Sequence, residues 1–398
     1  MGKQLADKRP ISSRQAMSIV SSTILGVGVL TLPRVVASEA HEAGWIAILC
    51  GAFATSIVMI IVTKLGLRFP HLNFIETCSH VLGRDKGKSN KLGKLLSYPI
   101  IIILIAYYLV VAASISRTFG EVVVTAVLKE TPLEVIIGTM LLTSLYLVKF
   151  DIDVLARLNE LLLPLIVIPI LLIALLSFQS FQLEFILPVW PGLSLSGFLK
   201  GVLLTMFAYQ GYELILIFSN RIQIIKKSLW FNILGIIIPS VIYLLIVIAG
   251  ISVFGDEELA ILMWPTLEII KVTEVPGMIL ERLESLFLGV WVAAVFTTTA
   301  NFFYAITLLT QQVFGRGKRI WYGLGFTPII FWLSLQPQNI IALFDFQQYI
   351  GYAGLTLGAL IPAFLLIMAF IRKKGSSTGP LATKGPSAKE KSTAIQQE

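Results

Sequence analysis

Long apolar runs recur along almost the whole chain, and they constrain its fold more than any other feature. An apolar run of about 18 residues or more spans a bilayer as a helix. Hydrophobic residues make up 56% of the sequence and charged residues 14%, and the mean hydropathy of +0.85 lies far outside the range of soluble domains. The sequence therefore predicts an all-α integral membrane protein. We expect ten spans, at 13–36, 45–67, 97–127, 132–148, 158–178, 197–219, 229–253, 282–313, 320–336 and 349–371.

The ten spans divide into two sets of five. An odd number of spans in each half places the second half upside down relative to the first, which is the arithmetic of an inverted repeat. We therefore expect a first five-helix repeat and a second one, joined by an external loop. The expected parts are a cytoplasmic N-terminus at 1–10, the first repeat at 11–178, the loop at 179–196, the second repeat at 197–371 and a disordered cytoplasmic tail at 372–398.

The basic residues are distributed unevenly between the two sides of the predicted bundle. With the N-terminus inside, 25 of the 31 Lys and Arg residues lie on the cytoplasmic side, five lie outside and Arg117 lies within a span. Cytoplasmic loops of membrane proteins carry this excess. We expect both termini in the cytoplasm, and the topology explains the net charge of +8 without a nucleic-acid partner.

Glycines interrupt the first and the sixth spans at corresponding places. The first span contains Gly26 and Gly28, with Pro33 five residues further on, and the sixth contains Gly211. An unwound helix in a membrane exposes backbone groups that lipid does not satisfy, so it survives where it lines a cavity or is buried in protein. Paired breaks of this kind mark a small-solute site in transporter-type folds, and the end of a half-helix holds a carboxylate without a cation. Close packing of small residues is the alternative.

Glu213 follows the second break and lies in apolar surroundings. A carboxylate is unfavourable in lipid, so the side chain must face the bundle interior, pair with another group or carry a proton. It is a candidate for a ligand contact, a proton carrier or a conformational lock. The simpler interpretation is a polar tie between helices.

Other polar residues in the third and eighth spans are further candidates. Arg117 and Glu121 are four residues apart on one helical face, which indicates a structural or gating ion pair. The hydroxyl of Tyr107 reaches the central cavity or bonds locally. Thr297 and Thr298 suit a ligand wall, although threonine also bonds the carbonyl of its own helix.

The sequence contains no pattern typical of catalysis or metal binding. His41, His71 and His80 lie outside the spans without metal-ligand spacing, and there is no phosphate-binding loop or catalytic triad. We therefore expect no enzyme activity, no cofactor and no metal site.

These features occur together with motifs that resemble one known family, the B-subunit permeases of bacterial spore germinant receptors (GerAB type) of the amino acid–polyamine–organocation superfamily. The resemblance covers about 370 residues, and its two most specific motifs are Trp264-Pro265-Thr266 and Glu281-Arg282-Leu283-Glu284-Ser285. The other matching stretches are Ile11-Ser12 with Gln15, Gly26-Val27-Gly28, Leu30-Thr31-Leu32-Pro33-Arg34, Gly44-Trp45, Arg68-Phe69-Pro70 and Gly211-Tyr212-Glu213.

The resemblance implies a LeuT-like fold with discontinuous helices 1 and 6, residence in the inner membrane of the spore, and partnership with an A subunit and a lipoprotein C subunit. It further implies that the cavity binds a nutrient germinant, commonly an amino acid, and that binding triggers germination. The germinant contacts that it implies are Gly26, Gly28, Tyr107, Gln210, Gly211, Glu213, Thr297 and Thr298.

Two functions remain open at this stage, a ligand-gated receptor subunit and a proton-coupled amino acid transporter. A lysine within the fifth span would favour proton coupling, as in some permeases of this superfamily. The fifth span has Arg157 and Glu160 at its cytoplasmic start and no internal lysine, which favours the receptor.

Overall fold

A computed structural model describes residues 10–70, 72–83, 91–187, 194–223, 227–272, 283–315 and 317–375. Over these ranges the chain is helical, apart from an isolated backbone bridge between Ile11 and Ile222. The helices of the first half are α1 (Ser13–Ile24), α2 (Gly28–Ala40), α3 (Gly44–Arg68), α4 (Phe74–Leu82), α5 (Lys91–Ala126), α6 (Leu133–Val148) and α7 (Ile152–Leu176). Those of the second half are α8 (Leu195–Ala208), α9 (Leu214–Phe218), α10 (Ser228–Ile261), α11 (Pro265–Val272), α12 (Leu283–Phe314), α13 (Arg319–Ser334), α14 (Ile340–Leu355) and α15 (Ile361–Ile371). A π-helical turn, Thr356–Leu360, joins α14 to α15, and short 3-10 turns lie at His41–Ala43, Ser177–Ser180, Leu183–Phe185 and Ser219–Arg221.

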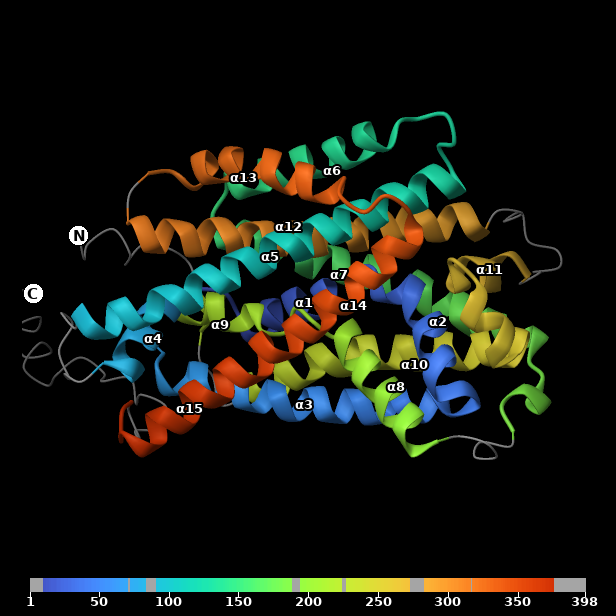
Figure 1. The fold of residues 1–398 in the computed structure, drawn as a ribbon, viewed down its shortest axis with the longest axis horizontal. Helices are drawn as coiled ribbons and strands as arrows, with labels where there is room; N and C mark the ends of the chain where they lie inside the picture. The colour runs from blue at the N-terminus through green and yellow to red at the C-terminus, as the bar shows by residue number, and fades with distance from the viewer. Residues whose placement is uncertain are drawn as a thin grey trace, which may run out of the picture.

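The predicted spans coincide with helices, and the first and the sixth are each divided in two. The chain unwinds at 25–27 between α1 and α2, and at 209–213 between α8 and α9. Within the described ranges, six helical stretches are long and apolar enough to cross a membrane, and α6 and α8 are shorter apolar helices. In Figure 1, α3, α5, α10 and α12 run along the long axis, and α6 and α13 lie together at one edge. Because α1 packs on α7, α10 and α12, and α2 on α8 and α10, other helices enclose the first break.

Several predicted boundaries differ from the structure. The helices α5 and α7 begin at Lys91 and Ile152 rather than at 97 and 158, and α10 ends at Ile261 rather than at 253. The last span was expected to begin at residue 349, but its helix begins at Ile340, where the Asn339 side chain accepts a hydrogen bond from the Ala342 N–H at 2.8 Å. The polar side chains of the first turns lower the local hydropathy and hide this start. The tail was expected to begin at 372, but residues 372–375 are ordered against α4; the rest of the predicted tail lies outside the described residues.

A proline in α2 frees a backbone carbonyl, and the Trp-Pro-Thr motif bonds it. Pro33 has no N–H, so the carbonyl of Val29 lacks its partner within α2. Thr266 at the start of α11 donates its hydroxyl to this oxygen at 2.6 Å. The indole N–H of Trp264 donates to Thr125 Oγ1 at 3.3 Å. The motif therefore attaches α11 to the helix that leaves the first break.

A proline in α10 is compensated in the same way from the other side of the bundle. Pro239 frees the carbonyl of Gly235, and Ser21 of α1 donates its hydroxyl to that oxygen at 3.1 Å. A freed carbonyl in lipid is costly, so each of these hydroxyls fixes the position of one helix on another.

The first described residues are attached to the segment that follows α9. Ile11 donates its N–H to the carbonyl of Arg221 at 2.8 Å, and its own carbonyl accepts from Gln223 N at 2.7 Å. Ser12 and Gln15 form a capping box at the start of α1, which accounts for one of the sequence motifs. The two half-helices α1 and α9 are thereby joined at the same end of the bundle.

The end of the second half is attached to the first half through basic side chains. Arg372 donates to the carbonyls of Val81 and Leu82, and the buried Lys374 ammonium donates to that of His80, so they satisfy the last carbonyls of α4. From α3, Arg68 lies over the ring of Phe370 at 4.1 Å and donates to backbone carbonyls at the end of α15.

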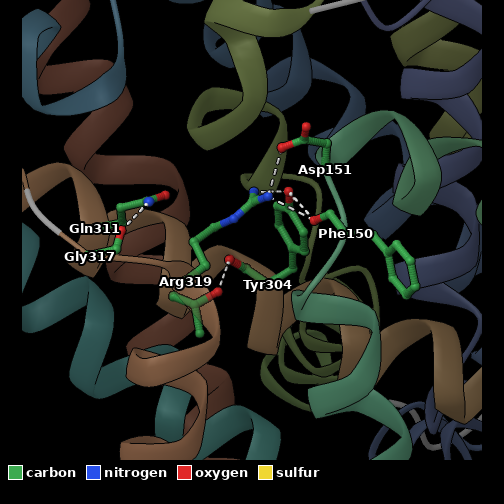
Figure 2. Close-up of polar contacts among 7 residues, drawn as sticks. Phe150, Asp151, Tyr304, Gln311, Gly317 and Arg319 are labelled. Atoms are coloured by element: carbon green, nitrogen blue, oxygen red, sulfur yellow. Dashed lines mark hydrogen bonds and ion pairs between the residues drawn. The ribbon is translucent and has the colours of Figure 1, made fainter.

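Arg319 fixes α13 to the loop between α6 and α7 (Figure 2). Its guanidinium donates to the Phe150 carbonyl at 2.7 Å, forms an ion pair with Asp151 at 3.0 Å and donates to the Tyr304 hydroxyl. The guanidinium carbon also lies 4.6 Å from the centre of the Tyr304 ring. The side chain is only 12% exposed, so these contacts are largely shielded from water.

We predict that Arg319→Ala destabilises the fold by about 1.5–3 kcal/mol, because it leaves the Phe150 carbonyl and the Asp151 carboxylate without their charged donor. Thermal unfolding of the purified protein in detergent measures the effect. Lys318→Ala, at the exposed neighbouring position, is the matched control and should leave the melting temperature unchanged. Equal melting temperatures for both variants would contradict a structural role for Arg319.

Candidate functional site

A cavity of about 310 Å³ lies beside both helix breaks. It follows α2 from the first break for about three turns, and α5, α8, α12 and α14 complete its walls. The lining residues are Thr23, Ile24, Val27, Gly28, Thr31, Leu32, Arg34, Val35, Ser38, Glu39, Val111, Ser114, Ile115, Leu204, Phe207, Ala208, Gln210, Thr298, Phe302, Phe344, Asp345, Gln347, Gln348, Ile350 and Gly351.

The start of α2 lies at the wall of the cavity. Val27 is the N-cap residue of α2, and no side chain accepts a hydrogen bond from the first turn of this helix at that cap. The first N–H groups of a helix have no partners within it and carry the positive end of the helix dipole. Since Val27 and Gly28 both line the cavity, this end of α2 favours an electron-rich group.

The cavity also has an apolar wall, which other helices provide. Ile115 on α5, Leu204 and Phe207 on α8, and Phe302 on α12 line the cavity. A site with a donor group at one side and apolar side chains at the other orients a small amphipathic molecule.

At the first break, side chains from α10 and α12 bond the freed carbonyls. The Tyr243 hydroxyl donates to the Ile24 carbonyl at 2.6 Å, and the Trp291 indole N–H donates to the Gly26 carbonyl at 3.0 Å. The Tyr243 hydroxyl also lies 3.4 Å from the carbonyl of Ala208, at the second break. One tyrosine therefore contacts both breaks.

Thr298 and Asn301 of α12 satisfy the last turn of α1. The Thr298 hydroxyl lies 3.1 Å from the carbonyl oxygens of both Ser22 and Thr23. Asn301 donates to the Thr23 hydroxyl at 2.8 Å and exchanges hydrogen bonds with Asn159 of α7. Side chains of α10 and α12 thus bond the carbonyl groups of Ser22, Thr23, Ile24 and Gly26, while Val27 and Gly28 at the start of α2 line the cavity.

The glycines of the breaks admit these contacts. A Cβ atom on Gly26 would lie 2.3 Å from Thr298 Oγ1, and one on Gly28 would lie 2.3 Å from the Tyr243 hydroxyl. Gly211 has a φ of +114°, which favours glycine, and its Cβ would lie 2.4 Å from Thr23 Cγ2. The close-packing interpretation of the glycines therefore holds, and it coexists with the cavity.

Of the predicted germinant contacts, three line the cavity and five do not. Gln210, in the second break, connects two other helices. Its side-chain amide donates to the Gly351 carbonyl of α14 at 2.6 Å and accepts from the Tyr107 hydroxyl of α5 at 2.9 Å. Tyr107 does not line the cavity itself, but it holds the side chain of Gln210, which does. The lining residues are Gly28, Gln210 and Thr298, and those behind the wall are Gly26, Tyr107, Gly211, Glu213 and Thr297.

Thr297 and the predicted ion pair of Arg117 and Glu121 make their contacts away from the cavity. The Thr297 hydroxyl bonds the carbonyl of Ala294 in its own helix at 2.8 Å, as the simpler interpretation had it. Arg117 and Glu121 lie 2.8 Å apart, and Arg117 donates to the Ser334 carbonyl at 3.4 Å. This places the ion pair between α5 and the end of α13.

Sequence reasoning missed several residues of this region. Tyr243 and Trp291 carry polar atoms in the middle of apolar spans, and that signal was available. Phe207, directly before the second break, and Phe302 look like ordinary core residues in a sequence. Arg34 lies 4.4 Å from the Phe344 ring centre, a pairing of α2 with α14 that only the fold reveals.

The comparisons with known proteins agree with this architecture. The family described as spore germination protein matches residues 10–341. The chain belongs to this family. Three curated members are similar over 92% of the chain: YndE of Bacillus subtilis (31% identical, 98% of that protein), A2 of Bacillus subtilis (26%, 96%) and GerLB of Bacillus cereus (28%, 95%). The family is one of permease-like membrane proteins and not a class of enzymes.

Two solved transporters share the fold. MHP1, a nucleobase-cation-symport-1 family transporter, aligns with a TM-score of 0.66 at 13% identity, over 92% of this chain and 79% of its own. MhsT, solved in complex with L-phenylalanine, aligns with a TM-score of 0.65 at 12% identity, over 91% and 90%. The fold is therefore LeuT-like, with helices 1 and 6 discontinuous, as the sequence predicted.

We predict that Gly26→Ala destabilises the protein by about 1–3 kcal/mol, because its methyl group displaces Thr298 from the last carbonyls of α1. Gly138→Ala is the control, since a Cβ there meets no atom within 4 Å. Alanine is the better helix former, so the control should be neutral or slightly stabilising. Thermal unfolding in detergent distinguishes the two, and a neutral Gly26→Ala would refute the close contact.

Proposed function

We propose that this chain is the germinant-binding, permease-like subunit of a spore germinant receptor. In this proposal a small solute, an amino acid in the first instance, binds in the cavity beside the two breaks. Ligand binding shifts the population of two conformations, because the ligand binds one of them more tightly. The position of the cavity between the start of α2 and the second break is the observation that carries the proposal.

The chemistry of the cavity supports an amino acid with an apolar side chain. Its carboxylate would accept hydrogen bonds from the first turn of α2, and the side chain would pack on Leu204, Phe207 and Phe302. The carboxylates of Glu39 and Asp345 also line the cavity, but Glu39 pairs with Lys200 and lies about three turns of α2 away from its first turn. The structural neighbour MhsT was solved with L-phenylalanine, which is consistent with this class of ligand in this fold.

The rest of the proposal follows from the family. A and C subunits of the receptor would be the protein partners, and the spore inner membrane would be the site of residence, with both termini cytoplasmic. The relatives are germination proteins by name, and the excess of basic residues on one side supports the orientation.

Leu204→Trp should weaken ligand binding at least tenfold, because the indole occupies the cavity beside the second break. Thermal-shift titration of the purified protein against amino acids, sugars and nucleosides identifies the ligand and measures the loss. Leu199→Trp is the matched control, on the same helix but 57% exposed. Undiminished binding to a folded Leu204→Trp variant would place the ligand elsewhere.

The similarity to proteins named for spore germination favours a receptor over a proton-coupled transporter. We therefore expect no concentrative uptake of the identified ligand by the purified chain in proteoliposomes. Robust uptake driven by a proton gradient would establish the transporter instead.

A further inference from the structure

Glu213 is a buried carboxyl group with half of its hydrogen-bonding capacity unused. Among the described residues it is the only acidic side chain that is buried, with 4% of its surface exposed. Its Oε2 accepts a hydrogen bond from the Gly211 N–H at 2.9 Å. Its Oε1 has no partner within the described part of the chain. The carboxyl group lies behind the second break and does not line the cavity.

The groups that surround Glu213 are uncharged. Tyr107 and Tyr108 of α5 and Tyr212 of the break itself lie within electrostatic range. The Tyr212 hydroxyl is also buried and lacks a partner among the described residues. No ion pair in these ranges includes Glu213.

The elements packed on α9 are α1, α3, α4, α12 and the turn Ser219–Arg221, and none of their described charged groups forms an ion pair with Glu213. Arg14 of α1 pairs with Glu160 at 3.2 Å, and Arg68 of α3 bonds the carbonyls at the end of α15. On α12, the titratable side chain next to α9 is Tyr304, whose hydroxyl accepts from Arg319. None of these groups supplies a positive charge to the carboxyl group.

The π-helical turn between α14 and α15 lies next to Glu213. Pro362 lacks the N–H that would bond the Gly358 carbonyl, and the chain forms the π-helical turn there. A Cβ on Gly358 would lie 3.1 Å from the Tyr212 hydroxyl oxygen and 3.6 Å from Glu213 Oε2. The site therefore combines a carboxyl group, a hydroxyl group and a locally loosened backbone, and π-turns of this kind are frequent at functional sites.

We propose that Glu213 is a proton-binding site within the membrane, separate from the ligand cavity, and that it holds its proton in this conformation. A bare carboxylate with one backbone donor and no cation is strongly disfavoured in such a place, whereas the neutral acid is tolerated. The proposal concerns the ligand-free chain and does not depend on which solute the cavity takes.

The site is connected to the cavity by one short stretch of backbone. Gly211, which donates to Glu213, follows Gln210, which lines the cavity and bonds both α14 and Tyr107. The N–H group that donates to the carboxyl group is therefore one residue away from the cavity wall.

Infrared spectroscopy of the purified ligand-free chain at neutral pH tests the proposal. The expected result is a carboxylic-acid carbonyl band that shifts when all glutamates carry ¹³C, disappears in Glu213→Gln and persists in Glu258→Gln, an exposed control. The isotope arm uses the unmodified sequence, so even if Glu213→Gln fails to fold it shows whether a glutamate is protonated, and Glu213 is the only buried glutamate among the described residues.

Three outcomes would overturn the proposal. Absence of the band from the labelled wild type would show that the carboxyl group is ionised. Persistence of the band in a folded Glu213→Gln protein would assign the proton to another acid. Loss of the band on addition of sodium at constant pH would make the site one for a metal cation. Because no ligand is added, none of these results bears on the proposed germinant site.

Discussion

The structure depends on one requirement, that backbone groups freed inside a membrane find partners within the protein. Two broken helices and two prolines free carbonyl groups at the centre of the bundle. Hydroxyl, indole and amide donors from other helices bond them: Tyr243 for Ile24, Trp291 for Gly26, Thr266 for Val29 and Ser21 for Gly235. Each bond crosses between helices, so satisfying the backbone also determines how the helices are arranged.

The same requirement explains why the cavity has its particular polarity. Side chains bond several of the carbonyl groups at the breaks, and the first turn of α2 lines the cavity together with polar side chains such as Arg34, Gln210 and Asp345. Glycines at the breaks keep the side-chain donors within bonding distance, and they do so by leaving out a Cβ rather than by contacting a ligand themselves. Gly28 does both, since it packs on Tyr243 and lines the cavity.

The sequence predicted the helices, their division into halves and the two breaks, because hydropathy and glycine position are local properties. It predicted less of the site. Of the predicted contacts, Gln210 and Thr298 line the cavity, but Thr297, next to Thr298 on α12, bonds the carbonyl of Ala294 in its own helix. The side chains that donate hydrogen bonds to the breaks come from other helices, and a single sequence does not show which helices pack together. The start of α14 was missed for a related reason. Its polar residues line the cavity, and in the sequence they are typical of a loop.

Both ends of the described chain are fastened to the body of the bundle. Ile11 is held by backbone bonds to the second half, while Arg372 and Lys374 are held by the carbonyls of α4 in the first half. Each half of the described chain therefore binds the terminal segment of the other half through non-covalent contacts. As a consequence, a movement of either half relative to the other must also move, or break the bonds of, the terminal segment that it holds.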